Sequence, residues 1–86
     1  LGPANLNTGI ARIKLGRALL RQNRHREAAA ESLAGYEILA KQTDPAVSFL
    51  RAARTDLAAA YTALGMTAEA DRFRAELAET TSPPTP

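Results

Sequence analysis

Apolar side chains recur three and four positions apart along most of the chain, the spacing that gathers them on one face of an α-helix. Between residues 5 and 22 the apolar residues at helical spacing are Ile10, Ile13, Leu15, Leu19 and Leu20, and the last three are predicted to form the broad inner stripe. Between residues 25 and 41 they are Ala28, Leu33, Tyr36 and Leu39. Asn23 separates the two stretches, and Asn tolerates the left-handed conformation that ends helices. The first half of the chain is therefore predicted to form two helices joined by a tight turn.

The second half begins at Thr43-Asp44-Pro45, where Thr or Asp can cap a helix and Pro fits its first turn. The next helix is predicted to end at Gly65 and to be apolar at Phe49, Leu50, Ala53, Leu57, Ala60, Tyr61 and Leu64. A fourth helix is predicted from Thr67, with inner positions at Ala70, Phe73 and Leu77. Residues 80–86 have the sequence Thr-Thr-Ser-Pro-Pro-Thr-Pro, which cannot continue a helix and is expected to form a disordered tail.

The two halves repeat one pattern with an offset of 42 residues. The matched positions are Pro3 and Pro45, Ala4 and Ala46, Ala11 and Ala53, Arg12 and Arg54, Leu15 and Leu57, Ala18 and Ala60, Asn23 and Gly65, Glu27 and Glu69, Ala28 and Ala70, and Glu37 and Glu79. Chance rarely aligns prolines, turn residues and Glu-Ala pairs in a single register. We therefore predict an all-α fold of two antiparallel helix hairpins, at residues 5–42 and 43–79, stacked as a short right-handed solenoid with a C-terminal capping helix. Residues 1–4 are predicted to be the remnant of a preceding inter-repeat turn.

The repeated motif resembles the tetratricopeptide repeat, in which Leu-Gly is followed by a large residue, a turn glycine and Glu-Ala. In the first copy the motif consists of Leu15-Gly16, Leu19, Asn23 and Glu27-Ala28. In the second copy it consists of Leu57-Ala58, Tyr61, Gly65 and Glu69-Ala70. The usual repeat has 34 residues, so a period of 42 indicates longer helices. The resemblance implies that Gly16 lies where two helices cross closely. Because the second copy has Ala58 there, Gly16→Ala is expected to be tolerated.

Nearly the whole chain is similar to the C-terminal repeat segment of bacterial serine/threonine protein kinases of the eukaryote-like type, down to the phrase from Tyr61 to Leu77. This resemblance implies a non-catalytic protein-interaction or scaffold module of a larger signalling protein. These 86 residues contain no Gly-rich loop, His-Arg-Asp or Asp-Phe-Gly motif of a kinase catalytic domain, so the segment is not expected to be an enzyme. A cytoplasmic location is expected, or an extracytoplasmic one if the parent chain carries a membrane-spanning helix before this segment.

Composition argues against several other classes of function. The chain has no cysteine, which excludes a disulfide framework and a thiolate metal site. Its single histidine, His25, lies between two arginines at a predicted helix start, where a solvated residue is expected and not a metal ligand or a base. No apolar run approaches the ~20 residues that cross a bilayer, so no membrane contact is expected. Neither a metal nor a cofactor is predicted.

Charge is nearly balanced, with 11 basic and 9 acidic residues and a net charge of +2, which does not by itself indicate nucleic-acid binding. Lys14, Arg17, Arg21 and Arg24 nevertheless form one basic stripe along the first helix, at spacings of three and four. Such a stripe attracts an acidic peptide, a phosphorylated segment or nucleic acid, but it also fits a solvated helix face. No aromatic residue interleaves with the stripe, which argues against stacking on single-stranded nucleic acid.

In tetratricopeptide repeats the first helix of each hairpin lines a concave groove. The resemblance therefore implies a partner-binding groove made of Ile10, Ile13, Lys14, Arg17, Leu20, Arg21, Arg24, Thr55, Ala59 and Thr62. Relatives that bind chaperone tails hold a peptide carboxylate with a clamp of Lys, Asn and Arg. Here Ile13 replaces the clamp Lys, and Ala52 and Asp56 replace a basic pair, so a chaperone-tail receptor is not expected.

The predicted partner is a protein or peptide of acidic character, and no nucleic acid is expected. A homodimer through the first helix is also predicted, because Leu6, Ile10 and Ile13 would be exposed there and would gain by mutual burial. Two alternatives remain open on the sequence alone: a nucleic-acid-binding helical domain that uses the basic stripe, and a structural spacer with no ligand.

Overall fold

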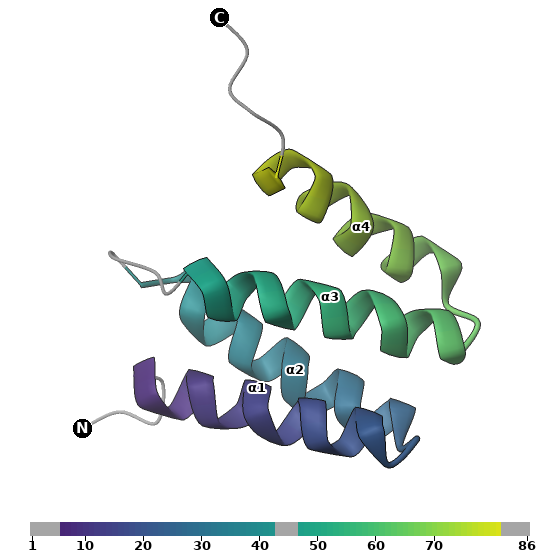
Figure 1. The fold of residues 1–86 in the computed structure, drawn as a ribbon, viewed down its shortest axis with the longest axis horizontal. Helices are drawn as coiled ribbons and strands as arrows, with labels where there is room; N and C mark the ends of the chain where they lie inside the picture. Colours follow the sequence, from purple (N-terminus) through teal and green to yellow (C-terminus); the bar gives the residue numbers. More distant parts are fainter. Residues whose placement is uncertain (1–5, 43–46, 82–86) are drawn as a thin grey trace, which may run out of the picture.

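The structure is a computed structural model that describes residues 6–42 and 47–81. It contains the helices α1 (Leu6–Arg21), α2 (His25–Ala40), α3 (Val47–Ala63) and α4 (Thr67–Thr81), and no strand lies in the described ranges. The fold is therefore all-α, as predicted. Consecutive helices run in opposite directions and pack on each other, and α1 also contacts α3 (Figure 1). Among the described helices, only α3 has a backbone that comes close to the backbone of α4.

The turns that end α1 and α3 have the same geometry, 42 residues apart. Asn23 has a φ of 61° and Gly65 a φ of 75°, both in the left-handed region. The amides of Asn23 and Arg24 donate to carbonyls of α1, each at 3.0 Å, and those of Gly65 and Met66 donate to carbonyls of α3 at 3.1 and 2.8 Å. These paired bonds form Schellman motifs, which satisfy the last carbonyls of each helix. Both predicted helix ends are confirmed.

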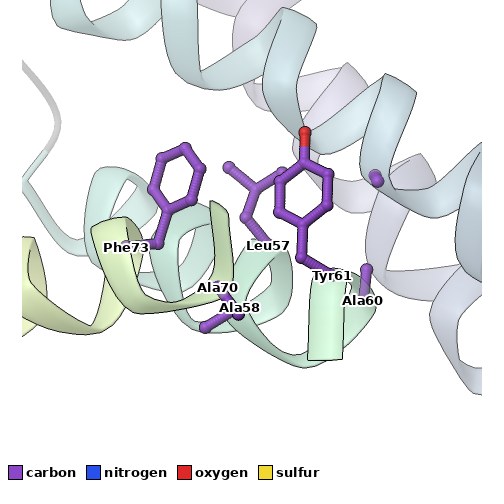
Figure 2. Close-up of a cluster of buried hydrophobic side chains, with 7 residues drawn as sticks. Leu57, Ala58, Ala60, Tyr61, Ala70 and Phe73 are labelled. Atoms are coloured by element: carbon purple, nitrogen blue, oxygen red, sulfur yellow. The ribbon is translucent and has the colours of Figure 1, made fainter. Parts of the chain in front are cut away.

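The larger core cluster joins α2, α3 and α4 and consists of Ala29, Leu57, Ala58, Ala60, Tyr61, Ala70 and Phe73. Figure 2 shows the Tyr61 ring rising from α3 toward α2, and Phe73 reaching in from α4. These two rings are nearly parallel, with centroids 6.0 Å apart. The ring of Tyr36 stands perpendicular to Phe73 at a centroid distance of 5.5 Å. Burial of these apolar and aromatic surfaces holds α4 against the other helices.

A second cluster lies between α1, α2 and α3 and consists of Ile13, Leu39, Leu50 and Ala53. Ile13 is only 2% exposed, and Ile10 is half-buried against the same cluster. The expectation that Leu6, Ile10 and Ile13 form an exposed face for a homodimer is therefore wrong, because Leu6 is the one exposed residue of the three. Leu15, predicted as an inner position, is 48% exposed and was also misplaced.

Both errors have one cause, which is that the apolar pattern does not show which face of α1 is turned toward the core. The buried residues of α1 are Gly9, Ile13, Gly16 and Leu19. A glycine adds nothing to an apolar pattern, so the two buried glycines do not reveal which face is turned inward. Leu15 is two positions after Ile13, which is about 200° around a helix of 3.6 residues per turn. It therefore points away from the core.

The crossing of α1 and α2 depends on the absence of side chains at glycines. A Cβ on Gly35 would lie 2.6 Å from the carbonyl oxygen of Gly9. A Cβ on Gly16 would overlap the Ser32 hydroxyl and lie 3.0 Å from the Ser32 amide nitrogen. The close crossing expected at Gly16 is therefore present, but the expected tolerance of Gly16→Ala is not supported. The comparison with the second copy fails because Arg74, not serine, occupies the position equivalent to Ser32.

Helix α4 extends to Thr81, so Thr80 and Thr81, which were assigned to the disordered tail, are helical. The first proline of the tail is Pro83, and proline disfavours the helical conformation only from the residue that precedes it. The predicted turn remnant at residues 1–4, the capping segment at 43–46 and the rest of the tail at 82–86 lie outside the described residues.

Glu76 of α4 links three helices through its carboxylate. Its Oε1 accepts hydrogen bonds from the Tyr36 hydroxyl at 2.6 Å and Arg54 Nε at 3.2 Å, and its Oε2 accepts from Arg72 Nε at 3.3 Å. Burial raises the pKa of Glu76, but these three hydrogen bonds outweigh burial and lower the pKa below its ordinary 4.5. Burial, and then the bond to Glu76, raise the pKa of Tyr36 above its ordinary 10.0. The Tyr36–Glu76 contact fixes α4 relative to α2, across α3.

Candidate interaction groove

A hollow of about 210 Å³ lies between α1 and the first turns of α3. It is lined by Ile13, Lys14 and Arg17 from α1 and by Ser48, Phe49 and Ala52 from α3. The two helices are brought together here because Ile13 and Leu50 belong to one core cluster and Phe49 packs against it. The groove is therefore a fixed feature of the packed core and not of a loop.

Apolar side chains form the floor of the groove and two cations form its rim. Ile13 is buried and Phe49 half-buried, so both present apolar surface to the hollow. The Lys14 ammonium lies 5.9 Å from the centroid of the Phe49 ring, within range of a cation–π interaction. No carboxylate pairs with Lys14 within the described residues.

Arg17 is held in place by Asp56 of α3. Its Nε donates to Asp56 Oδ2 at 3.1 Å, and a terminal guanidinium nitrogen donates to Oδ1 at 3.4 Å. Asp56 is 7% exposed, whereas the arginine side chain is about half exposed. A buried carboxylate needs such a two-point partner, and the pair in turn orients the guanidinium across the groove. Lys14 is thus the only uncompensated charge among the residues that line the hollow.

The predicted basic stripe does not act as one charged surface. Lys14, Arg17, Arg21 and Arg24 are all exposed, as their spacing requires. Arg17 is neutralised by Asp56, and Arg24 pairs with Glu27 at 2.6 and 2.9 Å. Arg21 has no ion-pair partner in the part of the chain that the structure describes, but it does not line the groove. The stripe is therefore reduced to two uncompensated cations, of which one faces the hollow.

Of the ten groove residues predicted from the sequence, the structure brings Ile13, Lys14 and Arg17 together around the hollow. Ile10 and Leu20 are half-buried and pack against the core clusters. The remaining positions away from the hollow are Arg21, Arg24, Thr55, Ala59 and Thr62, all exposed.

The hydroxyls of both threonines already have hydrogen-bond partners within the protein. That of Thr55 donates to the carbonyl of Arg51, and that of Thr62 donates to the carbonyl of Ala58 and accepts from the Arg74 guanidinium of α4 at 2.5 Å. Hydroxyls bonded one turn back along a helix have less capacity to hold a partner. The α3 side of the predicted groove is therefore confined to its first turns.

Phe49 lines the hollow and Asp56 holds Arg17, and neither role is predicted above. The apolar period of its helix predicts Phe49 as a core residue, because a half-buried aromatic at a groove has the same spacing as a core residue. Asp56 carried a usable signal: with the 42-residue offset it falls at the position of Lys14, one turn before Arg17. A carboxylate at that place in the second copy faces the first helix of the first copy.

A larger hollow of about 490 Å³ lies between the start of α2 and the end of α3, lined by Arg26, Ala29, Ala30, Tyr61, Leu64 and Met66. Its lining is aliphatic and aromatic apart from Arg26, and Met66 is exposed. It holds none of the residues predicted to bind a partner.

Chemical groups for catalysis do not converge in either hollow. The described ranges contain no group of three or more His, Cys, Asp or Glu side chains that could hold a metal ion. Among the helices that the structure describes, none is both long and apolar enough to span a membrane. The groove presents two kinds of surface to a ligand, the apolar floor of Ile13 and Phe49 and the ammonium group of Lys14.

Comparisons of the chain with protein-family models, with curated proteins and with solved structures found no match. Function is therefore inferred from the residues of the chain itself.

Proposed function

We propose that this chain is a non-catalytic protein-interaction module that binds an acidic peptide segment in the α1–α3 groove. One observation carries the proposal: Lys14 is an uncompensated cation above an apolar floor formed by Ile13 and Phe49. A cation beside an apolar hollow complements a segment in which a carboxylate neighbours an apolar side chain.

The size of the groove restricts what it can hold. Sites for whole small molecules usually occupy about 300–1,000 Å³. A hollow of about 210 Å³ is smaller than that range and suits one side chain of a peptide whose backbone continues across the surface. The bidentate pair of Arg17 and Asp56 keeps the rim rigid, so little ordering is required when the peptide binds.

The same proposal extends to the architecture and the parent protein. Two hairpins of equal design with identical Schellman turns 42 residues apart support a short right-handed solenoid of tetratricopeptide type. On the resemblance described above, we place the module in the C-terminal region of a bacterial serine/threonine kinase or a related signalling protein. The sequence of the complete gene tests this placement, and a parent chain with no signalling domain would contradict it.

The groove is tested with a fluorescein-labelled peptide of sequence Glu-Glu-Leu-Glu-Glu, titrated with the chain and followed by fluorescence anisotropy. Binding is expected with a dissociation constant below about 1 mM, and the matched peptide with Gln in place of each Glu should bind at least about tenfold more weakly. Lys14→Glu reverses the charge at the groove and should weaken binding of the acidic peptide by about tenfold or more.

Arg21→Glu is the matched control, because Arg21 lies on the same helix, is exposed and uncompensated within the described residues, and is outside the hollow. Its effect on affinity should be small and should vanish at high salt. Equal losses in the Lys14 and Arg21 variants would show diffuse attraction to the whole helix. Absence of binding to either peptide would favour a structural spacer, and tight, salt-dependent binding of a DNA or RNA oligonucleotide would favour a nucleic-acid module.

A further inference from the structure

The first helix of each hairpin has the same apolar pattern but different surroundings. On α3, Ala53, Leu57 and Ala60 are buried and belong to the core clusters that include residues of α2. The equivalent residues of α1, 42 positions earlier, are Ala11, Leu15 and Ala18, and all three are exposed. The contrast is largest at the leucines, because Leu57 is 0% exposed and Leu15 is 48% exposed.

The internal repeat shows what covers this pattern when it is buried. On α3 the covering helix is α2, which contributes Ala29 and Leu39 to the clusters and packs Leu33 against them. Nothing in the described residues takes that place over Leu15. In Figure 1, α1 lies at one edge of the molecule and α4 at the other, with α3 between them. The face of α1 formed by Ala11, Leu15 and Ala18 is called the outer face below.

We infer that the outer face of α1 is a docking surface for a partner helix hairpin built like α1–α2, whose second helix packs on α1 as α2 packs on α3. The partner's second helix carries a small residue and leucines at the positions that correspond to Ala29, Leu33 and Leu39. This surface adjoins the peptide groove, because Leu15 does not line the hollow but the neighbouring Lys14 does.

Charge specifies one more residue of the partner. The stack of α3 on the first hairpin includes the ion pair between Arg17 of α1 and Asp56 of α3. The residue of α1 equivalent to Asp56 is Lys14. A hairpin that docks in the same register places its own equivalent of Arg17 beside Lys14. A carboxylate at that position of the partner's first helix would reproduce the pair with the signs exchanged.

A second copy of this chain does not offer a matching surface. Its α2 face is already covered by α3, as described above. The equivalent positions on α4 to Ala29 and Leu33 are Asp71 and Ala75, both exposed, which cannot supply the leucine contacts. Pairing two outer faces would bring together the uncompensated cations Lys14 and Arg21 of both copies, and like charges in contact destabilise an interface.

Because the two hairpins repeat with an offset of 42 residues, an added copy of residues 1–42 can be joined to the chain in the register that the proposal requires. Residues 1–42 are duplicated in front of Leu1, with Arg17 of the added copy changed to Glu, which gives an extended chain that contains all 86 residues of the original. The added α2 then meets the outer face in the register in which α2 meets α3. Thermal unfolding is measured for the original and the extended chain, each with and without Leu15→Ser in the original copy.

Leu15→Ser is expected to change the Tm of the original chain by less than about 2 °C, because the side chain is exposed there. In the extended chain it should lower the Tm by at least about 4 °C, as the loss of a buried leucine does. Leu6→Ser is the matched control, since Leu6 is also an exposed leucine of α1 but its equivalent, Ser48, remains exposed on α3. It should have the same effect in both chains.

The charge prediction has its own comparison. The extended chain with Glu at position 17 of the added copy should melt at a higher temperature than the one that keeps Arg there. Lys14→Gln in the original copy should remove that difference. A difference that persists in the Lys14 variant would show that the glutamate acts elsewhere.

The proposal is overturned if Leu15→Ser has equal effects in the two chains, or if circular dichroism shows that the added residues stay unfolded. It is also overturned if the original chain sediments as a dimer that Leu15→Ser dissociates, because a second copy would then be the occupant. Hydrogen exchange provides a second readout: the amides of residues 11–18 should exchange more slowly in the extended chain than in the original.

Discussion

At the scale of single residues, α1 and α2 pack closely because three glycines at their crossing have no side chain. Gly9 and Gly16 of α1 and Gly35 of α2 allow the two backbones to approach each other within van der Waals contact. Glycine in a helix interior costs stability relative to alanine, by about 0.5–1 kcal/mol. Here the cost is offset by the close crossing, so substitutions report directly on the space at each glycine.

Gly35→Ala and Gly9→Ala are expected to differ in their effect on the free energy of unfolding. A Cβ at Gly35 would lie 2.6 Å from a backbone oxygen, which moves only if the helix moves, so a loss of about 1–3 kcal/mol is expected. A Cβ at Gly9 would meet the side chains of Ile38 and Leu39 at 3.0–3.2 Å, and these can adjust. Gly9→Ala should therefore remain within about 1 kcal/mol of the wild type. Urea unfolding measures both, and the reverse order would contradict the crossing geometry.

Gly16→Ala is expected to be rescued in part by a change at Ser32. The Ser32 hydroxyl is buried without a hydrogen-bond partner among the described residues and occupies the space that the new methyl group would need. Ser32→Ala should therefore stabilise by up to about 1 kcal/mol, and Gly16→Ala should destabilise by about 1–3 kcal/mol. The double variant should be more stable than the sum of the two single changes by about 1 kcal/mol or more. Additive effects would show that the hydroxyl is not the obstacle.

At the scale of the elements, the sequence predicts what local chemistry decides and fails where packing decides. Helix ends at Asn23 and Gly65 are predictable because a left-handed residue and its hydrogen bonds are local features. The inward face of α1 is not, because leucines and isoleucines occur on both sides of that helix and buried glycines give no apolar signal. Leu15 and Ile13 were therefore placed on the wrong sides of the same helix.

The free energy of unfolding is expected to depend on pH through Glu76 of α4. Its hydrogen bonds to Tyr36, Arg54 and Arg72 hold its pKa below the unfolded value of 4.5, so the folded state favours the charged carboxylate. The stabilisation is therefore fully present above pH 4.5 and is lost as the pH falls through the lower pKa of the folded state. Glu76→Gln should destabilise at neutral pH, and its difference from wild type should shrink in acid. Glu37→Gln changes an exposed carboxyl of α2 and serves as the control. A constant difference for Glu76→Gln from neutral to acid pH would contradict this account.

At the scale of the whole molecule, the two hairpins share one sequence pattern but expose different surfaces, because α2 packs on α3 and no described helix packs on the equivalent face of α1. The second hairpin is covered on one side by α2, whereas the outer face of α1 is open, and the α1–α3 groove lies where the two hairpins meet. The α1 part of the groove at Ile13, Lys14 and Arg17 could be predicted from the repeat resemblance. The place of Phe49 could not, because it depends on how far α3 is displaced along α1. The neutralisation of Arg17 by Asp56 could be inferred only from the 42-residue offset, which the apolar pattern alone does not use.

The most direct test of the proposed function is the place where the acidic peptide binds. Amide chemical shifts of the chain labelled with ¹⁵N are followed by NMR while Glu-Glu-Leu-Glu-Glu is added. We expect the largest changes at Ile13, Lys14, Phe49 and Ala52, with little change at Thr55, Ala59 and Thr62. The changes should be lost in the Lys14→Glu variant and retained in the Arg21→Glu variant. Shifts centred instead on the hollow at Tyr61 and Met66, or spread along α1 to Arg24, would contradict the groove as the binding site.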